Sequence, residues 1–181
     1  MPSRLPSHVR ERLTPIRMLV LDVDGVLTDG TLTYSADGEL LKRFDAKDGL
    51  GLKMAQLAGL KVGVLSGRDS AALERRATEL KLEFLSMGVE DKRAGRETFL
   101  KRHNTVARRI AYIGDDLPDL VVLGQCGLSF APADAAQEVR DVVHQVLDSP
   151  GGHGAVREMV EIVLRARGEW DQLYSRFTFD S

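Results

Sequence analysis

Residues 16–30 read IRMLVLDVDGVLTDG, a short apolar run that ends in closely spaced acidic residues. The apolar run of residues 16–21 is typical of a β-strand that is buried on both faces of a sheet. Asp22 and Asp24 follow the run, and Gly25 allows the chain to turn sharply behind them. The stretch predicts a strand with two carboxylates at its carboxyl end. Taken alone, these residues are equally typical of a strand-end turn with a capping aspartate.

Strand-like and helix-like segments alternate along the rest of the chain. The expected strands are residues 61–65, 82–85, 110–113, 127–130 and 142–146. The expected helices are residues 50–60, with Asp48 as the N-cap, and residues 70–80, 93–102, 117–123, 135–140 and 155–167. The alternation predicts an α/β fold with three layers, in which helices cover both faces of a parallel Rossmann-like sheet. Ligands bind at the carboxyl ends of the strands in such sheets.

Residues 31–35 and 39–44 are strand-like on either side of Ala36-Asp37-Gly38, which predicts a β-hairpin after the first strand. We expect this hairpin to act as a flap over a site that has no separate cap domain. Residues 1–15 are interpreted as a lead-in, residues 16–168 as one domain, and residues 169–181 as a tail with Phe177 and Phe179. An uncapped site excludes water poorly, so we expect the hairpin to mediate a homo-oligomer in which adjacent chains help to close each site.

The composition is that of an ordinary globular protein, with 43% hydrophobic and 29% charged residues in 181. A formal net charge of -2 and 6% aromatic residues give little support for nucleic acid as a partner. Cys126 is the only cysteine, so no internal disulfide can form, and we interpret it as a small buried hydrophobe. The sequence shows neither a signal peptide nor an apolar stretch long enough to span a bilayer. We therefore expect a cytoplasmic protein without a membrane partner.

Two further groups of polar residues point to anion binding. Ser66-Gly67-Arg68 follows the strand at residues 61–65, where a hydroxyl and free backbone N–H groups can cradle a phosphate. Lys92 opens the helix at residues 93–102, where the helix dipole gives a cation no advantage. Each has a simpler interpretation on its own: Ser66 as a helix cap and Lys92 as a solvated surface residue.

The strand at residues 110–113 ends in the acidic stretch GDDLPD, residues 114–119. Asp115, Asp116 and Asp119 crowd this strand end, and carboxylates at close range repel one another unless a cation joins them. Oxygen ligands of this kind suit Mg²⁺. Asp116 could instead cap the helix that follows.

The four groups follow one another in the order acidic pair, hydroxyl, lysine, acidic cluster. Because of these groups and their order, residues 16–167 resemble the haloacid dehalogenase (HAD) superfamily of phosphohydrolases. The resemblance implies that Asp22 is the nucleophile that attacks phosphorus and that Asp24 is the general acid and base. It also implies that Mg²⁺ is held by the Asp22 carboxylate, the Asp24 backbone carbonyl and Asp115.

The same resemblance implies that Ser66 and Lys92 hold the transferring phosphoryl oxygens, while Asp116 and Asp119 support the metal from nearby. A phosphate dianion must approach a carboxylate, and the metal and Lys92 offset that repulsion.

Longer motifs narrow the resemblance to the family of 3-deoxy-D-manno-octulosonate 8-phosphate phosphatases. They are DVDGVLTDG at 22–30, FDAKDGLG at 44–51, SGR at 66–68, GDD at 114–116 and GGHGAVRE at 151–158. That family is uncapped and tetrameric and acts in lipopolysaccharide synthesis. The resemblance therefore implies a homotetramer that acts on a small phosphorylated sugar acid. The segment at 151–158, which carries Arg157, could border the pocket or form a flexible helix entry.

The family's substrate contacts fall on ten positions here: Asp24, Asp45, Ala46, Lys47, Asp48, Gly49, Lys53, Arg68, Arg76 and Lys92. Asp45 stands where the family often has asparagine, and its charge disfavours contact with an anionic sugar. Lys47 and Lys53 stand where arginine is common, and lysine cannot reproduce a bidentate arginine contact. The simpler interpretation of Lys53 and Arg76 is a solvated helix face.

Three other functions compete with this interpretation. A related phosphatase for another sugar acid, such as an N-acylneuraminate 9-phosphate, would share the same catalytic residues. A receiver domain also combines acidic residues, Mg²⁺, a hydroxyl and a lysine, but its phosphorylated aspartate lies on a middle strand. A catalytically silent assembly domain would not need Asp22, Asp24, Ser66, Lys92 and Asp115 together.

Overall fold

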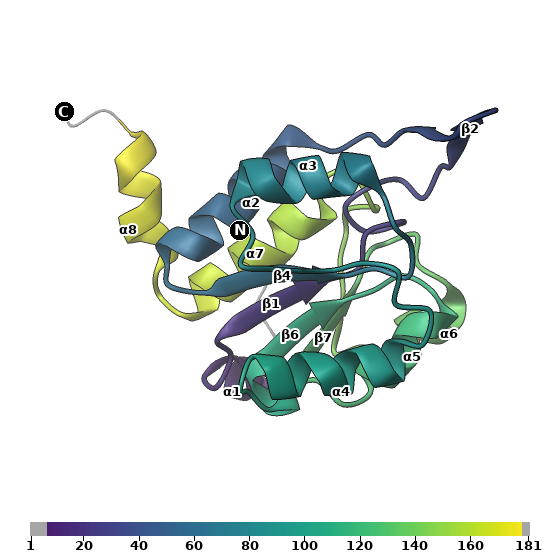
Figure 1. The fold of residues 1–181 in the computed structure, drawn as a ribbon. Helices are drawn as coiled ribbons and strands as arrows, with labels where there is room; N and C mark the ends of the chain where they lie inside the picture. The colour runs from purple at the N-terminus through teal and green to yellow at the C-terminus, as the bar shows by residue number, and fades with distance from the viewer. Residues whose placement is uncertain (1–6, 179–181) are drawn as a thin grey trace.

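The computed structural model describes residues 7–178, which form a six-stranded parallel sheet with helices on both faces (Figure 1). The strands lie in the order β5-β4-β1-β6-β7-β8, and every neighbouring pair is parallel. Their bounds are β1 Met18–Leu21, β4 Lys61–Leu65, β5 Phe84–Ser86, β6 Ile110–Ile113, β7 Leu128–Ala131 and β8 Gln145–Val146. Because β1 lies between β4 and β6, the loops after these three strands meet at one edge of the sheet.

The helices form two layers that enclose the sheet, as the alternating pattern predicts. One layer contains α2 Ala46–Leu57, α3 Ala71–Leu80 and α7 Ala155–Ala166. The other contains α4 Lys92–Arg102, α5 Leu120–Leu123 and α6 Gln137–Arg140. Short 3₁₀ turns, η1 Ala107–Arg109 and η2 Leu117–Asp119, flank β6. The α/β/α fold class is therefore confirmed.

The central strand β1 is buried on both faces. Leu19 and Leu21 pack toward α2 and α7, whereas Met18 and Val20 pack toward α4 and α5. Burial of each such side chain stabilises the fold by about 1.5–3 kcal/mol, so the position of β1 is fixed from both sides. Cys126 belongs to the same hydrophobic cluster as Met18 and Val20, and its burial there raises the pKa of its thiol to about 12. Its interpretation as a buried hydrophobe is confirmed.

The start of α2 differs from the expected helix at residues 50–60. Asp45, not Asp48, is the N-cap, and its Oδ1 accepts a hydrogen bond of 2.6 Å from the backbone N–H of Lys47. The first turn of α2 is polar, so the apolar spacing that marks a helix begins only after it. Asp48 is 1% exposed and accepts hydrogen bonds from the backbone N–H groups of Arg157 (2.7 Å) and Gly154 (3.4 Å). Asp48 thus caps α7, whose own N-cap position is a glycine without a side chain.

The predicted hairpin consists of β2 Thr33–Ser35 and β3 Gly38–Leu41, which pair antiparallel. Its turn is Ala36-Asp37. Gly38, which the sequence placed in the turn, is the first residue of β3 and pairs with Ser35 of β2. Figure 1 shows the hairpin extending away from the body of the molecule, beyond the carboxyl ends of the sheet.

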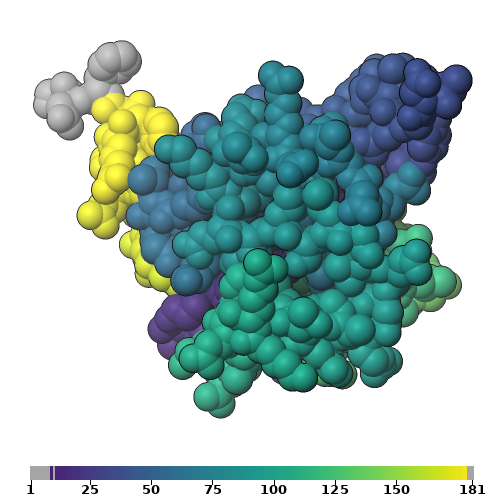
Figure 2. Space-filling view, viewed as in Figure 1, coloured from purple at the N-terminus to yellow at the C-terminus, as the bar shows by residue number. Residues whose placement is uncertain are grey.

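Two helices flank the sheet domain near the ends of the described chain: α1 Ser7–Leu13 and α8 Trp170–Tyr174, which continues into η3 Ser175–Phe177. Trp170 and Leu173 are buried, so this part of the expected tail packs on the domain. Residues 1–6 of the expected lead-in, and Phe179 with the last two residues, lie outside the described residues. In Figure 2, the hairpin in dark blue and the C-terminal helix in yellow lie on opposite sides of the molecule. Of the helices in residues 7–178, none is both long and apolar enough to cross a membrane.

Candidate active site

A cleft of about 600 Å³ opens where the loops after β1, β4 and β6 meet. The residues that line it are Asp22, Asp24, Gly30, Leu32, Gly67, Arg68, Val89, Glu90, Lys92, Asp115, Asp116, Pro118 and Asp119. Acidic and basic side chains from distant parts of the sequence thus converge on one opening. This is the edge of the sheet at which the sequence predicts a site.

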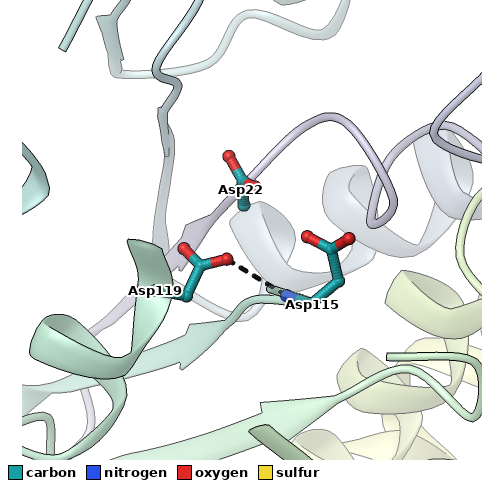
Figure 3. Close-up of side chains that lie close together, drawn as sticks. All are labelled: Asp22, Asp115 and Asp119. Carbon is teal, nitrogen blue, oxygen red and sulfur yellow. Dashed lines mark hydrogen bonds between the residues drawn. The ribbon is translucent and has the colours of Figure 1, made fainter. Parts of the chain in front are cut away.

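Three aspartates lie together at the base of this cleft (Figure 3). Asp22, Asp115 and Asp119 each offer one oxygen, and these oxygens all lie within 4.8 Å of one another. Among the described residues, Asp115 Oδ1 is buried without a hydrogen-bond partner. A buried oxygen without a donor, beside two other carboxylates, fits a divalent cation that prefers oxygen ligands.

The crowding of these carboxylates raises their pKa values. Burial, together with the charges of Asp22 and Asp119, raises the pKa of Asp115 to about 8. Burial and the charge of Asp119 raise the pKa of Asp22 to about 6, although Lys92 acts in the opposite direction. Without a cation, Asp115 therefore holds a proton at neutral pH. A bound cation would favour the ionised forms.

Lys92 is the first residue of α4, and its side chain is only 5% exposed. Its Nζ lies 2.9 Å from Asp22 Oδ1 and 2.6 Å from Asp119 Oδ1. Burial alone would lower the pKa of Lys92, but the two carboxylates outweigh burial and raise it. The ammonium group is therefore charged and points at the predicted nucleophile, so the solvated-surface interpretation of Lys92 is wrong.

Asp119 anchors this arrangement from beneath. Its Oδ1 also accepts a hydrogen bond of 2.6 Å from the hydroxyl of the fully buried Tyr112, and its Oδ2 accepts one of 3.1 Å from the backbone N–H of Asp115. Tyr112 carries no motif signal, so sequence analysis missed it. Asp116 caps η2 through a hydrogen bond of 2.8 Å from the backbone N–H of Leu117, and the cap interpretation of Asp116 is confirmed.

Close backbone packing around Gly25 allows Asp115 to reach Asp22. Gly25 has a φ of +84°, and a Cβ at this position would lie 2.0 Å from Asp115 Oδ2. Gly151 packs behind the same loop, because a Cβ there would lie 1.9 Å from the carbonyl oxygen of Gly25. The GGHG segment at 151–154 therefore supports the loop after β1 and does not itself line the cleft.

Asp24 lies at the mouth of the cleft and contacts two cations. Lys42 Nζ donates to Asp24 Oδ1, and Arg68 Nε lies 3.9 Å from Asp24 Oδ2. The Arg68 guanidinium also contacts the hydroxyl of Tyr34 in the hairpin. Lys42 was not among the predicted site residues, because it follows the hairpin strand β3 and does not lie at a strand end of the parallel sheet.

Ser66 is 2% exposed, and its hydroxyl bonds to the backbone of Arg68, accepting from N–H (3.2 Å) and donating to the carbonyl oxygen (3.1 Å). It does not cap α3, because Ser70 does so by accepting from the backbone N–H of Leu73. The helix-cap interpretation of Ser66 is therefore wrong. Its hydroxyl shapes the loop that presents Gly67 and Arg68 to the cleft.

Of the ten predicted substrate contacts, the cleft of this chain contains Asp24, Arg68 and Lys92. The seven others lie on α2, at its N-cap or on α3: Asp45, Ala46, Lys47, Asp48, Gly49, Lys53 and Arg76.

The side chains of this second group have local partners or face solvent. Lys47 and Lys53 are exposed. The Arg76 guanidinium packs over Gly49 and donates to the carbonyl oxygen of Asp45 (3.3 Å) and to Glu79 (3.1 Å). Exposure of Lys53 agrees with the solvated-face interpretation, whereas Arg76, with a side chain 17% exposed, is held in place.

Comparison with known proteins identifies the family. No family model matches the chain. The 3-deoxy-D-manno-octulosonate 8-phosphate phosphatase KdsC of Haemophilus influenzae is 44% identical over 161 residues, which cover 89% of each chain. The enzyme of that name from Moraxella catarrhalis, solved with a magnesium ion, a phosphate ion and KDO, is 33% identical with a TM-score of 0.90. That alignment covers 94% of this chain and 98% of the other.

A HAD-superfamily hydrolase of subfamily III A from Legionella pneumophila is 34% identical with a TM-score of 0.88, over 94% of this chain and 93% of that structure. These similarities extend over nearly the whole chain and include the strand ends that form the cleft. The chain therefore belongs to the 3-deoxy-D-manno-octulosonate 8-phosphate phosphatase family of the HAD superfamily, and it is a phosphoric monoester hydrolase.

Proposed function

We propose that this phosphatase hydrolyses 3-deoxy-D-manno-octulosonate 8-phosphate to the free sugar acid and phosphate in lipopolysaccharide biosynthesis. We further propose that the reaction depends on Mg²⁺ and passes through a phosphoryl group on Asp22. The observation that carries the proposal is the placement of Lys92 Nζ 2.9 Å from Asp22 Oδ1, beside Asp115 Oδ1, which has no hydrogen-bond partner within residues 7–178.

The Asp22 carboxylate, the Asp24 backbone carbonyl and Asp115 would hold the metal. The donor set supports this assignment, because carboxylate and carbonyl oxygens are the ligands that Mg²⁺ accepts. When bound, Mg²⁺ supplies positive charge that offsets the repulsion between the substrate phosphate and Asp22. The Moraxella catarrhalis relative contains magnesium and phosphate together, which supports the same pairing here.

In the first step, an Asp22 oxygen forms a bond to phosphorus as the bond from phosphorus to the sugar oxygen breaks. The electron pair of the broken bond stays on the sugar oxygen, which takes a proton from the Asp24 carboxyl group. Lys92, fixed between Asp22 and Asp119, stabilises the negative charge on the phosphoryl oxygens. Ser66, in the loop whose Gly67 and Arg68 line the cleft, would help Lys92 to hold the same oxygens.

In the second step, Asp24 takes a proton from a water molecule whose oxygen attacks the phosphoryl group on Asp22. The bond from phosphorus to Asp22 breaks, which releases phosphate and regenerates the carboxylate. Asp24 thus acts as acid and then as base, and it ends the cycle as it began.

The remaining substrate contacts, Asp45 to Gly49 with Lys53 and Arg76, lie outside this chain's own cleft. We propose that they act in a homotetramer, in which the hairpin mediates contact between copies. Leu32, Tyr34 and Leu40 support a contact role for the hairpin, since they are 42%, 54% and 59% exposed. Sedimentation that finds a fully active monomer would refute this assembly.

A panel of sugar-acid phosphates, assayed with and without Mg²⁺, tests the proposal. We expect the highest kcat/KM with 3-deoxy-D-manno-octulosonate 8-phosphate, and no turnover after chelation until Mg²⁺ is restored. Preference for an N-acylneuraminate 9-phosphate would overturn the substrate, and turnover with chelator present would overturn the metal assignment.

A further inference from the structure

A buried lysine in the hairpin has no part in the reaction as written above. Lys42 directly follows β3, and its side chain is only 2% exposed. Its Nζ donates to Asp24 Oδ1 and lies 3.1 Å from Glu39 Oε2. Removing an ammonium group from water is unfavourable unless carboxylates compensate, so the location of Lys42 requires both partners.

Lys42 is also held from behind. Glu39 accepts a hydrogen bond from the Ser70 hydroxyl. Ser70 itself caps α3, because its Oγ accepts a hydrogen bond of 3.2 Å from the backbone N–H of Leu73. The ammonium group is therefore fixed between the loop after β1 and a helix of the sheet domain, even though it comes from a projecting hairpin.

The second cation near Asp24 is held much less firmly. Arg68 Nε is 3.9 Å from Asp24 Oδ2, beyond hydrogen-bond distance, and the Arg68 side chain is 43% exposed. Arg68 lines the open cleft, and its other contact is with Tyr34 in the exposed hairpin. Lys42 is the cation whose position is determined by the fold.

We infer that Lys42 is the positioning residue for Asp24, and that the hairpin thereby contributes to the reaction in its own chain. An ammonium group that donates to Oδ1 makes that oxygen an acceptor, so the proton that Asp24 gives to the leaving oxygen is carried by Oδ2. Lys42 thus determines which Asp24 oxygen faces the substrate. The inference rests on the acid and base role proposed above for Asp24.

A purely structural role predicts something different. If Lys42 only pins the hairpin to the domain, its loss should slow every substrate by a similar factor. If it positions the acid, its loss should matter most where the leaving oxygen needs a proton. The alkoxide of a sugar alcohol needs one, whereas 2,4-dinitrophenolate leaves without it.

The experiment compares kcat/KM for the sugar-acid phosphate and for 2,4-dinitrophenyl phosphate, because kcat/KM reports the step in which the leaving group departs. We expect Lys42→Met to lower the value about 10- to 100-fold for the sugar ester and less than about 3-fold for the dinitrophenyl ester. The matched control is Lys61→Met, since the Lys61 side chain is 59% exposed at the start of β4 and pairs with Glu83 in a surface contact of 3.4 Å. It should leave the ratio of the two values unchanged.

Equal losses on both esters would overturn the inference. If Lys42→Met does not fold, as judged by thermal unfolding, Lys42→Gln carries the same comparison. Asp24→Asn in the same assay separates the inference from the function on which it rests. A selective loss with Asp24→Asn but not with the Lys42 variants defeats only the role of Lys42, whereas no selective loss with Asp24→Asn defeats the acid assignment itself.

Discussion

Replacement of Asp115 by asparagine should have opposite effects on stability with and without metal. Asp115 belongs to the group of carboxylates within 4.8 Å, and its pKa is raised to about 8 by burial and by the charges of Asp22 and Asp119. At pH 7 this carboxyl is protonated in the folded protein but ionised in the unfolded chain, where its pKa is near 3.8. Folding at pH 7 therefore requires Asp115 to take up a proton that it lacks in the unfolded chain, and this lowers the free energy of unfolding.

The magnitude follows from the size of the shift. One pKa unit corresponds to about 1.4 kcal/mol, so the span from 3.8 to pH 7 sets an upper limit of about 4 kcal/mol. Because Asp22 shares the proton and a neutral amide keeps part of the desolvation penalty, we expect about half of this limit, ~2 kcal/mol. For a chain of this size, ~2 kcal/mol raises Tm by roughly 4–8 °C.

The assay is thermal unfolding at pH 7, in chelator and in excess Mg²⁺. In chelator, Asp115→Asn should melt above the parent protein. In Mg²⁺ the parent should gain stability as RT ln(1 + [Mg²⁺]/Kd), and the variant should gain little. Asp116→Asn is the matched control, because Asp116 is the adjacent carboxylate and asparagine also caps a helical turn. An Asp115→Asn variant that melts below the parent in chelator would show that carboxylate crowding does not destabilise the metal-free protein.

Three further predictions concern other parts of the site. Gly25→Ala should weaken Mg²⁺ binding, measured by calorimetry, at least about 10-fold, because the added Cβ would displace the Asp115 carboxylate. The control is Gly59→Ala, since Gly59 has a similar φ of +79° and its Cβ would have nothing within 4 Å. It should share only the backbone penalty of ~1 kcal/mol and leave Mg²⁺ binding intact. Asp48→Ala should lower the free energy of unfolding by about 1–2 kcal/mol through loss of the α7 cap; a raised KM at unchanged stability would instead support its predicted contact with substrate. Mg²⁺ affinity should rise as pH increases toward 8, because Asp115 must lose its proton to bind the metal. For the same reason, the free energy of unfolding of the metal-free protein should fall over pH 4 to 8. A Mg²⁺ affinity that is constant over this range would contradict the raised pKa of Asp115, on which both predictions rest.

The sequence predicts the fold and the centre of the site because both follow from local signals. Apolar runs identified the strands, and the rule that ligands bind at the carboxyl ends of parallel strands placed Asp22 and Asp115 together. The order of motifs predicted that Lys92 holds phosphoryl oxygens, and the structure places its Nζ 2.9 Å from Asp22 Oδ1.

Other features depend on contacts between distant residues, which no local pattern reveals. Asp48 has the sequence position of an N-cap for its own helix, yet it caps a helix that begins more than 100 residues later. Lys42 reaches Asp24 only because the hairpin folds back across 18 residues. Arg76 reads as part of an exposed helix face, but its guanidinium bonds to the carbonyl oxygen of Asp45.

The proposed reaction depends on transfer of the phosphoryl group to the Asp22 carboxylate. This transfer is tested most directly by acid quenching during turnover of 2,4-dinitrophenyl phosphate by the Asp24→Asn variant, in which the second step is slowed. Borohydride reduction then converts an aspartyl phosphate to homoserine, which peptide mass spectrometry locates. We expect homoserine at position 22 and none in Asp22→Asn. Homoserine in place of another aspartate, or turnover by Asp22→Asn at an undiminished rate, would show that Asp22 is not the nucleophile.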